Sequence, residues 1–196
     1  RDNPKADWYV WADPKADGSP PTNWQSVFGG PAWTWDARRG QYYLHNFLRE
    51  QPDLNFHNPE VQDATLATAK FWLDRGVDGF RLDALNFSMH DPELRDNPPA
   101  PDTGKRRTRS FDFQQHIYNQ SHADIPRFLE RIRALTDSYG GRFTVAAVGG
   151  PPPGAERPSP RSSVRSRAFH PVPCPSRSRR SSCGSRQVRR LPAEAS

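Results

Sequence analysis

The stretch Gly79–Asn86 holds the residues best placed to do chemistry, and it has the pattern of a short strand. Alternation along a strand puts Arg81 and Asp83 on one side. The apolar Phe80 and Leu82 then lie on the other side. In a parallel barrel the apolar side would face the surrounding helices, and Asp83 would stand at the carboxyl end of the strand, where barrel active sites are built.

A guanidinium beside a carboxylate keeps that carboxylate ionised through a charge-assisted hydrogen bond. Arg81 is placed to do this for Asp83. An ionised carboxylate at that point suits a nucleophile toward the anomeric carbon of a sugar. The alternative is a structural Arg–Asp pair that ends a strand, and an R-x-D pattern taken alone favours that simpler interpretation.

Motifs elsewhere in the chain bear on this choice. Gly79–Asn86 resembles the nucleophile strand of glycoside hydrolase family 13, the α-amylase superfamily. Gln51–Asn55 resembles the signature of its oligo-1,6-glucosidase and α-glucosidase branch. Three more stretches resemble, in order, two parts of the excursion domain after barrel strand three and the loop before barrel helix four: Asn23–Gly30 with Trp33, Tyr42–Phe47, and Gln115–Asn119. The resemblance runs nearly unbroken over residues 1–149, so the chain is identified as an internal piece of a member of this branch.

The resemblance implies roles for particular residues. Asp83 would be the catalytic nucleophile and Arg81 the partner that orients it. Phe28 would help shape the sugar pocket, with a plain core phenylalanine as the alternative. His45 is expected to be a loop or packing histidine, and Gln51–Asn55 to brace the entry to a helix.

The implied activity is retaining hydrolysis of short α-linked glucosides by double displacement, with no cofactor and with a small α-glucoside or oligosaccharide as the substrate. Trehalose synthase-like or sucrose-acting enzymes are the rival activities. A non-catalytic sugar-binding protein on the same barrel is a further alternative.

The second carboxylate of such a site is missing. A retaining glycosidase needs a general acid/base as well as a nucleophile. The resemblance places it as a Glu in a pattern like A-E-V-G-G on barrel strand five, where this chain reads Ala146–Gly150 with Ala147 at the acid position. No Asp or Glu occurs between Ser138 and Ala155. The chain is therefore expected to be inactive.

The surrounding elements follow the rhythm of a parallel α/β sheet. Asn58 can cap a helix over 59–75, with Pro59 in its first turn and a stripe of apolar and small residues from Val61 to Leu73. A strand over 77–84 follows. A long loop over 85–123 leads to a second helix over 124–139, and a strand over 143–148 comes next. The fold class is thus α/β, a fragment of a (β/α)8 TIM barrel.

The chain divides into three parts by composition. Residues 1–57, rich in Trp, Tyr, Pro and Gly, are expected to be an irregular, loop-rich excursion domain with short strands. Residues 58–150 are the barrel part. Residues 151–196 contain ten Arg, ten Ser and nine Pro, and they carry a net charge of +8, ten Arg against two Glu, whereas the remainder carries −2, 18 Lys and Arg against 20 Asp and Glu.

The composition of 151–196 predicts a disordered tail. The family pattern stops at Pro151, which suggests a frameshift product. Salt-dependent nucleic-acid binding through the tail arginines is the alternative, disfavoured by the lack of interleaved aromatic residues.

Other classes of function find little support in the sequence. No apolar run is long enough for a membrane span, no signal-peptide pattern is present, and a cytoplasmic protein is the default expectation. The first residue is Arg, which suggests a start within a longer product. No metal site is expected, because the histidines do not stand at ligand spacing on one helix or with Cys: His45, His57, His90, His116, His122 and His170.

Overall fold

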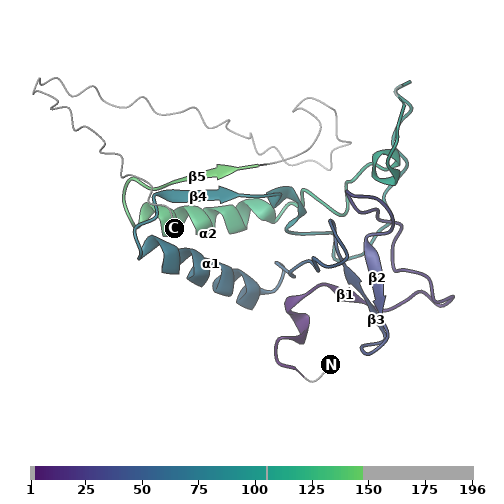
Figure 1. Cartoon of the computed structure of the whole chain (residues 1–196), viewed down its shortest axis with the longest axis horizontal. Helices are drawn as coiled ribbons and strands as arrows, with labels where there is room; N and C mark the ends of the chain where they lie inside the picture. The colour runs from purple at the N-terminus through teal and green to yellow at the C-terminus, as the bar shows by residue number, and fades with distance from the viewer. Residues whose placement is uncertain (1–2, 105, 148–196) are drawn as a thin grey trace, which may run out of the picture. The chain divides into compact units, whose positions relative to one another are not determined.

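The expected helix–strand–helix–strand order is confirmed by the computed structural model, which describes residues 3–104 and 106–147 (Figure 1). The elements are α1 (Pro59–Leu73), β4 (Gly79–Leu82), α2 (Ile125–Asp137) and β5 (Phe143–Ala146). Each is a few residues shorter than the sequence pattern predicts. The tail predicted over 151–196 lies outside the described residues.

Helix α1 begins and ends where local chemistry requires. The Asn58 side chain accepts a hydrogen bond from the Glu60 N–H at 2.9 Å. Pro59 suits the first helical position because it has no backbone N–H that would need an acceptor there. At the other end, Gly76 has φ +89 and donates its N–H to the carbonyl of Leu73. A left-handed residue of this kind terminates a helix at little cost when it is glycine.

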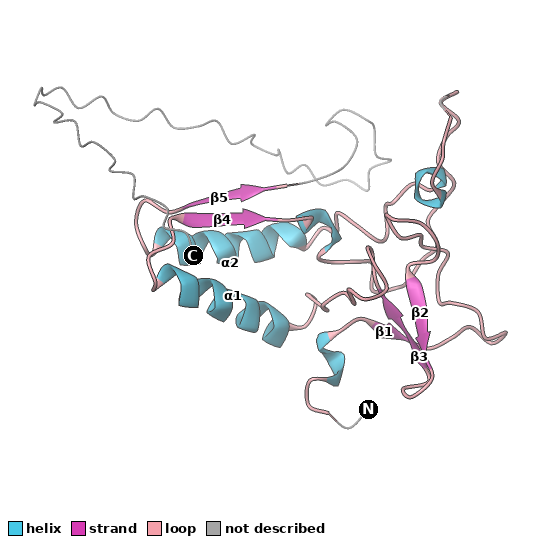
Figure 2. Cartoon of the chain, viewed as in Figure 1, coloured by secondary structure: helices cyan, strands magenta, loops and turns pink. Residues whose placement is uncertain are grey.

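Strands β4 and β5 pair in parallel, in the register Gly79 with Phe143 through Leu82 with Ala146. Both helices lie along one face of this pair (Figures 1 and 2). Leu82 packs on that side against a core drawn from the helices and the following loop: Leu85, Met89, Ile125, Phe128 and Ile132. The predicted apolar side of β4 therefore does face the helices.

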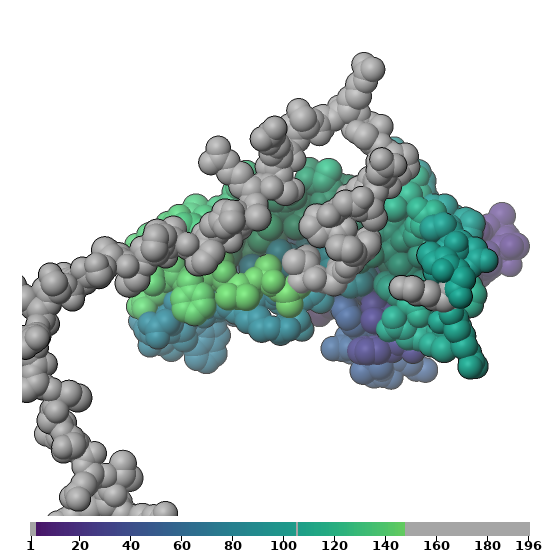
Figure 3. All heavy atoms as spheres, turned by 90° about the horizontal axis from the view of Figure 1, so that it is seen from above, coloured from purple at the N-terminus to yellow at the C-terminus, as the bar shows by residue number. Residues whose placement is uncertain are grey.

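The opposite face of the strand pair is exposed. Phe143 and Val145 are 61% and 54% exposed. Figure 3 shows yellow-green atoms of the β5 region at the surface. Two strands with helices on one side are part of a barrel wall, in agreement with the partial (β/α)8 barrel expected from the sequence.

The N-terminal excursion is irregular and has short strands, as predicted. A 3-10 turn, η1 (Ala6–Trp8), precedes β1 (Trp11–Ala12), β2 (Trp33–Asp36) and β3 (Gln41–Leu44). The three strands form an antiparallel sheet in the order β1-β3-β2. Its core is a separate apolar cluster: Val10, Ala12, Trp24, Ala32, Trp33 and Leu44.

A buried chain of amides joins the excursion to the long loop. Asn119 donates to the Asn46 side chain at 3.1 Å and accepts from the Asn97 side chain at 2.9 Å. Asn46 in turn donates to the Asp53 carboxylate at 2.6 Å. The loop over 85–123 also contains two 3-10 turns, η2 (Leu85–Phe87) and η3 (Ser110–Phe113). It is therefore fixed by side chains rather than by regular structure.

Among the described residues, no helix has the length and apolar character that crossing a bilayer requires.

Candidate active site

Asp83 and Ala147 occupy neighbouring positions at the carboxyl end of the strand pair. Asp83 directly follows β4, and Ala147 directly follows β5. Leu82 is paired with Ala146, and the Ala147 N–H donates to the Leu82 carbonyl at 2.8 Å. The sequence assigned both positions to the same catalytic pair, and the fold brings their backbones together.

Arg81 contacts Asp83 directly. Its Nη2 lies 2.9 Å from Asp83 Oδ1, and the two side chains are 65% and 72% exposed. Both therefore lie on the side of β4 that faces away from the helices, as alternation predicts. This contact orients the carboxylate of Asp83, and it suits a structural pair equally well.

The backbone turns sharply after Asp83. Ala84 has φ 45 and ψ 35, a left-handed conformation that costs a residue with a Cβ about 1–3 kcal/mol. This turn ends the strand and starts η2, which carries Phe87. Strain of this kind next to Asp83 is typical of functional sites, and no sequence pattern predicted it.

Phe28 is not a core residue, because its side chain is 64% exposed. Its ring lies 5.9 Å from that of Phe47, which lies 5.2 Å from that of Phe87. Phe111 continues the row 6.4 Å beyond Phe87. The sequence singled out Phe28 alone. The one available signal for Phe87 was its place four residues after Asp83, that for Phe47 was its place in the Tyr42–Phe47 motif, and Phe111 had none.

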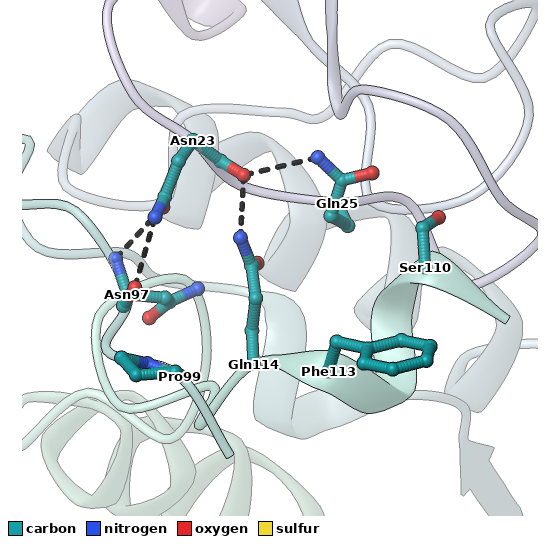
Figure 4. Close-up of a pocket in the computed structure, with 7 residues that line it drawn as sticks. All are labelled: Asn23, Gln25, Asn97, Pro99, Ser110, Phe113 and Gln114. Atoms are coloured by element: carbon teal, nitrogen blue, oxygen red, sulfur yellow. Dashed lines mark hydrogen bonds between the residues drawn. The ribbon is translucent and has the colours of Figure 1, made fainter. Parts of the chain in front are cut away.

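A cavity of about 540 Å³ lies between the excursion and the long loop, away from Asp83. Figure 4 shows that the side-chain amides of Gln25 and Gln114 both donate hydrogen bonds to the Asn23 carbonyl. Phe113, which is 52% exposed, forms part of the wall. The described residues that line it are polar and uncharged or apolar.

His45 and the Gln51–Asn55 motif have structural contacts. His45 is buried and bonds Thr34 Oγ1 at 2.9 Å. Asp53 accepts hydrogen bonds from the backbone and side-chain N–H groups of Asn46. Burial raises the pKa of Asp53 from its ordinary 3.8 to about 7, because desolvation outweighs these bonds.

The fold also gathers three groups that could hold a metal ion, although spacing along the chain predicted none. They are His57, His122 and Asp124, each of which offers one ligand atom within 4.8 Å of the others. His57 precedes α1 and the other two precede α2, so only the packing of the two helices reveals the cluster.

Comparison with known proteins shows which family the chain resembles. Residues 1–152 match the family described as "Alpha amylase, catalytic domain". The chain is 55% identical over 156 residues to a probable α-glucosidase of Rhizobium meliloti (strain 1021), covering 76% of this chain and 28% of that protein. It is 53% identical over 154 residues to an oligo-1,6-glucosidase of Heyndrickxia coagulans, covering 76% of this chain and 25% of that protein.

A solved structure has a similar fold over the part that matches. The crystal structure of the α-glucosyl transfer enzyme XgtA matches with a TM-score of 0.71 and 58% identity, over 74% of this chain and 28% of that one. The chain thus spans about a quarter of the length of the curated relatives it matches. Both the sequence matches and the fold lead to one conclusion: the chain belongs to the α-amylase catalytic-domain family, glycoside hydrolase family 13.

Proposed function

We propose that this chain carries the nucleophile half of a retaining α-glucosidase active site, with Asp83 as the nucleophile and Arg81 as the residue that orients it. The substrate class is short α-linked glucosides. With Ala147 at the general-acid position, the chain does not hydrolyse unactivated glucosides.

One observation carries this proposal: positions 83 and 147 are adjacent across parallel strands. Neighbouring strands lie about 4.8 Å apart. Two carboxyl groups on such positions would fit the separation of about 5–5.5 Å of a retaining enzyme better than the 6.5–9.5 Å of an inverting one. The site therefore has the geometry for a covalent glucosyl intermediate on Asp83.

The absence of an acid at position 147 makes this proposal testable. A leaving group such as fluoride departs without protonation, so the Asp83 carboxylate can attack C1, break the C1–F bond and form a glucosyl ester. Release of that ester needs a general base to activate water, and Ala147 cannot supply one. The glucosyl ester on Asp83 should therefore accumulate.

The experiment is to incubate the chain with α-glucosyl fluoride and to measure its intact mass and its labelled peptide. We expect one glucosyl unit on the peptide that contains Asp83, and its release by azide as a glucosyl azide of α configuration. Asp83→Asn should take no label. Asp78→Asn, at the other end of β4, serves as the control and should label normally, with circular dichroism showing that both variants are folded.

A folded chain that takes no label, or a label that persists in Asp83→Asn, would overturn the assignment. Binding of glucose or maltose without any label would favour the alternative function, a non-catalytic sugar-binding protein. The aromatic row that runs from the exposed Phe28 to the half-buried Phe87 supports that alternative, since an exposed ring can contact a sugar without catalysis. Release of the label by glucose to form a disaccharide would favour glucosyl transfer over hydrolysis.

A further inference from the structure

The starts of α1 and α2 meet at a cluster of imidazole and carboxylate groups. The two helices run side by side in the same direction (Figure 1), and Arg131 of α2 donates to Gln62 and Asp63 of α1. His57 lies two residues before α1, and the pair His122 and Asp124 lies immediately before α2. The ring centroids of the two histidines are 5.0 Å apart.

His57 is held in one tautomer. Its Nε2 lies 2.7 Å from the main-chain carbonyl of His90. A carbonyl only accepts, so Nε2 carries the hydrogen and Nδ1 keeps a free lone pair. Metal-binding histidines are oriented in this way, with the second ring nitrogen donating to a carbonyl or carboxylate.

Asp124 stands at the N-cap position of α2, yet its side chain makes no capping hydrogen bond. Its Oδ2 instead lies 3.7 Å from His122 Nδ1, and its Oδ1 lies 3.8 Å from Arg127. Both distances are too long for hydrogen bonds. The His122 ring is held beside this carboxylate because its Nδ1 accepts a hydrogen bond from the Asp124 N–H at 3.2 Å, which an ion bound at that nitrogen would replace.

The positive end of the α2 dipole disfavours a cation at this point. The carboxylate of Asp124, at the same end of the helix, supplies a negative charge that favours one.

We propose that His57, His122 and Asp124 form a binding site for a first-row divalent cation of the zinc class. Two imidazoles and one carboxylate are a common zinc ligand set, and a water molecule would complete the tetrahedron. Bond lengths of about 2.0–2.2 Å put ligand atoms roughly 3.3–3.6 Å apart. Side-chain rotations that move the ligand atoms by about 1 Å would therefore bring them to this separation. The ion would tie the start of α1 to the start of α2.

The test uses the full chain with Cys174→Ser and Cys183→Ser, because thiolates in the tail would otherwise compete for the metal. Co²⁺ is added under visible spectroscopy, and Zn²⁺ is then titrated by calorimetry. We expect one equivalent of Co²⁺ with the d–d bands of a low-coordinate nitrogen and oxygen site, displaced by Zn²⁺. Saturating Zn²⁺ should raise the Tm by roughly 5 °C.

Asp124→Asn and His122→Gln should each weaken Zn²⁺ binding at least about tenfold and remove the rise in Tm. Asp137→Asn, at the exposed opposite end of α2, is the matched control and should bind as the parent does. Asp124 makes no capping bond, so its replacement is not expected to unfold the helix. The proposal would be overturned if the parent did not bind Zn²⁺, or if both ligand variants bound it as tightly as the parent.

Discussion

The neighbouring positions Asp83 and Ala147 differ in the one property that catalysis needs. Asp83 carries a carboxylate held by Arg81 at 2.9 Å, whereas Ala147 carries a methyl group that can neither give nor take a proton. The two positions are adjacent in register, but Asp83 is exposed whereas Ala147 is half-buried. In the proposed function, position 147 is where this chain lacks the general acid.

The first prediction concerns that side chain. Ala147→Glu places a carboxylic acid beside Asp83 on the adjacent strand. We expect it to increase turnover of glucosides with poor leaving groups by about 10²–10⁴ relative to the parent chain, the usual contribution of general acid catalysis. Ala147→Gln is the control, and release of glucose from maltose is the measurement. Equal rates for the Glu and Gln variants would contradict the proposed role of this position.

The second prediction concerns Asp53, whose pKa is raised to about 7 in the folded chain. The folded state therefore holds this proton more tightly than the unfolded state does. The stability it contributes is fully present below about pH 4 and is lost as pH rises through about 7. The limit is about 1.4 kcal/mol per pH unit, and because the residue is partly exposed we expect a total loss of about 1–2 kcal/mol.

Urea denaturation at about pH 5 and about pH 8 measures this loss. Asp53→Asn keeps an oxygen that can accept from the N–H groups of Asn46, but it cannot ionise. We expect this variant to lose the pH-dependent step. Asp13→Asn, an exposed carboxylate in the same excursion, should keep it. A step of unchanged size in Asp53→Asn would show that another group titrates.

At the scale of elements, the periodicity of apolar side chains predicted the type and order of the helices and strands well, but predicted their terminal residues less well. The α2 face of Ile125, Phe128 and Ile132 is buried as the pattern predicts. The α1 stripe is only partly buried: Val61 and Leu73 are covered, but Trp72 is 49% exposed. The described part of the chain has no element over that side of α1, so the stripe lacks a partner there.

The third prediction concerns the strand pair. A Cβ built on Gly79 would lie 1.9 Å from the Phe143 carbonyl oxygen, a backbone atom that cannot move without shifting β5. We expect Gly79→Ala to destabilise the fold by about 1–3 kcal/mol through this overlap. Glu130→Ala, at an exposed position of α2, is the control. A thermal midpoint for Gly79→Ala that equals that of the control would show that β5 yields at no cost.

At the scale of the whole molecule, the excursion and the long loop are held together by a buried amide network in addition to the packing of Leu94 and Tyr118 against the apolar core of the excursion. Asn119 is fully buried and joins Asn46 to Asn97. His116 Nδ1 also lies 3.0 Å from its side-chain oxygen. Removing such a centre leaves several polar groups without partners, and each costs about 1–3 kcal/mol.

The fourth prediction follows from this network. Asn119→Ala should lower the free energy of unfolding by about 2–4 kcal/mol, and it should expose the long loop to proteolysis before the helices. Gln115→Ala, four residues earlier and exposed, should change stability by less than about 0.5 kcal/mol. Denaturant unfolding and limited proteolysis check both. A loss in Asn119→Ala no larger than in the control would mean that water replaces the amide.

The sequence by itself determined the order of the elements, the side of β4 that carries Arg81 and Asp83, and the lack of a carboxylate at Ala147. These features depend on the local periodicity of the side chains and on residue identity, both of which can be read from the sequence. Only the tertiary structure decided the aromatic row, the amide network and the cluster of His57, His122 and Asp124. Those groups come from segments far apart in the chain, and their meeting depends on how helices and loops pack, which spacing does not encode.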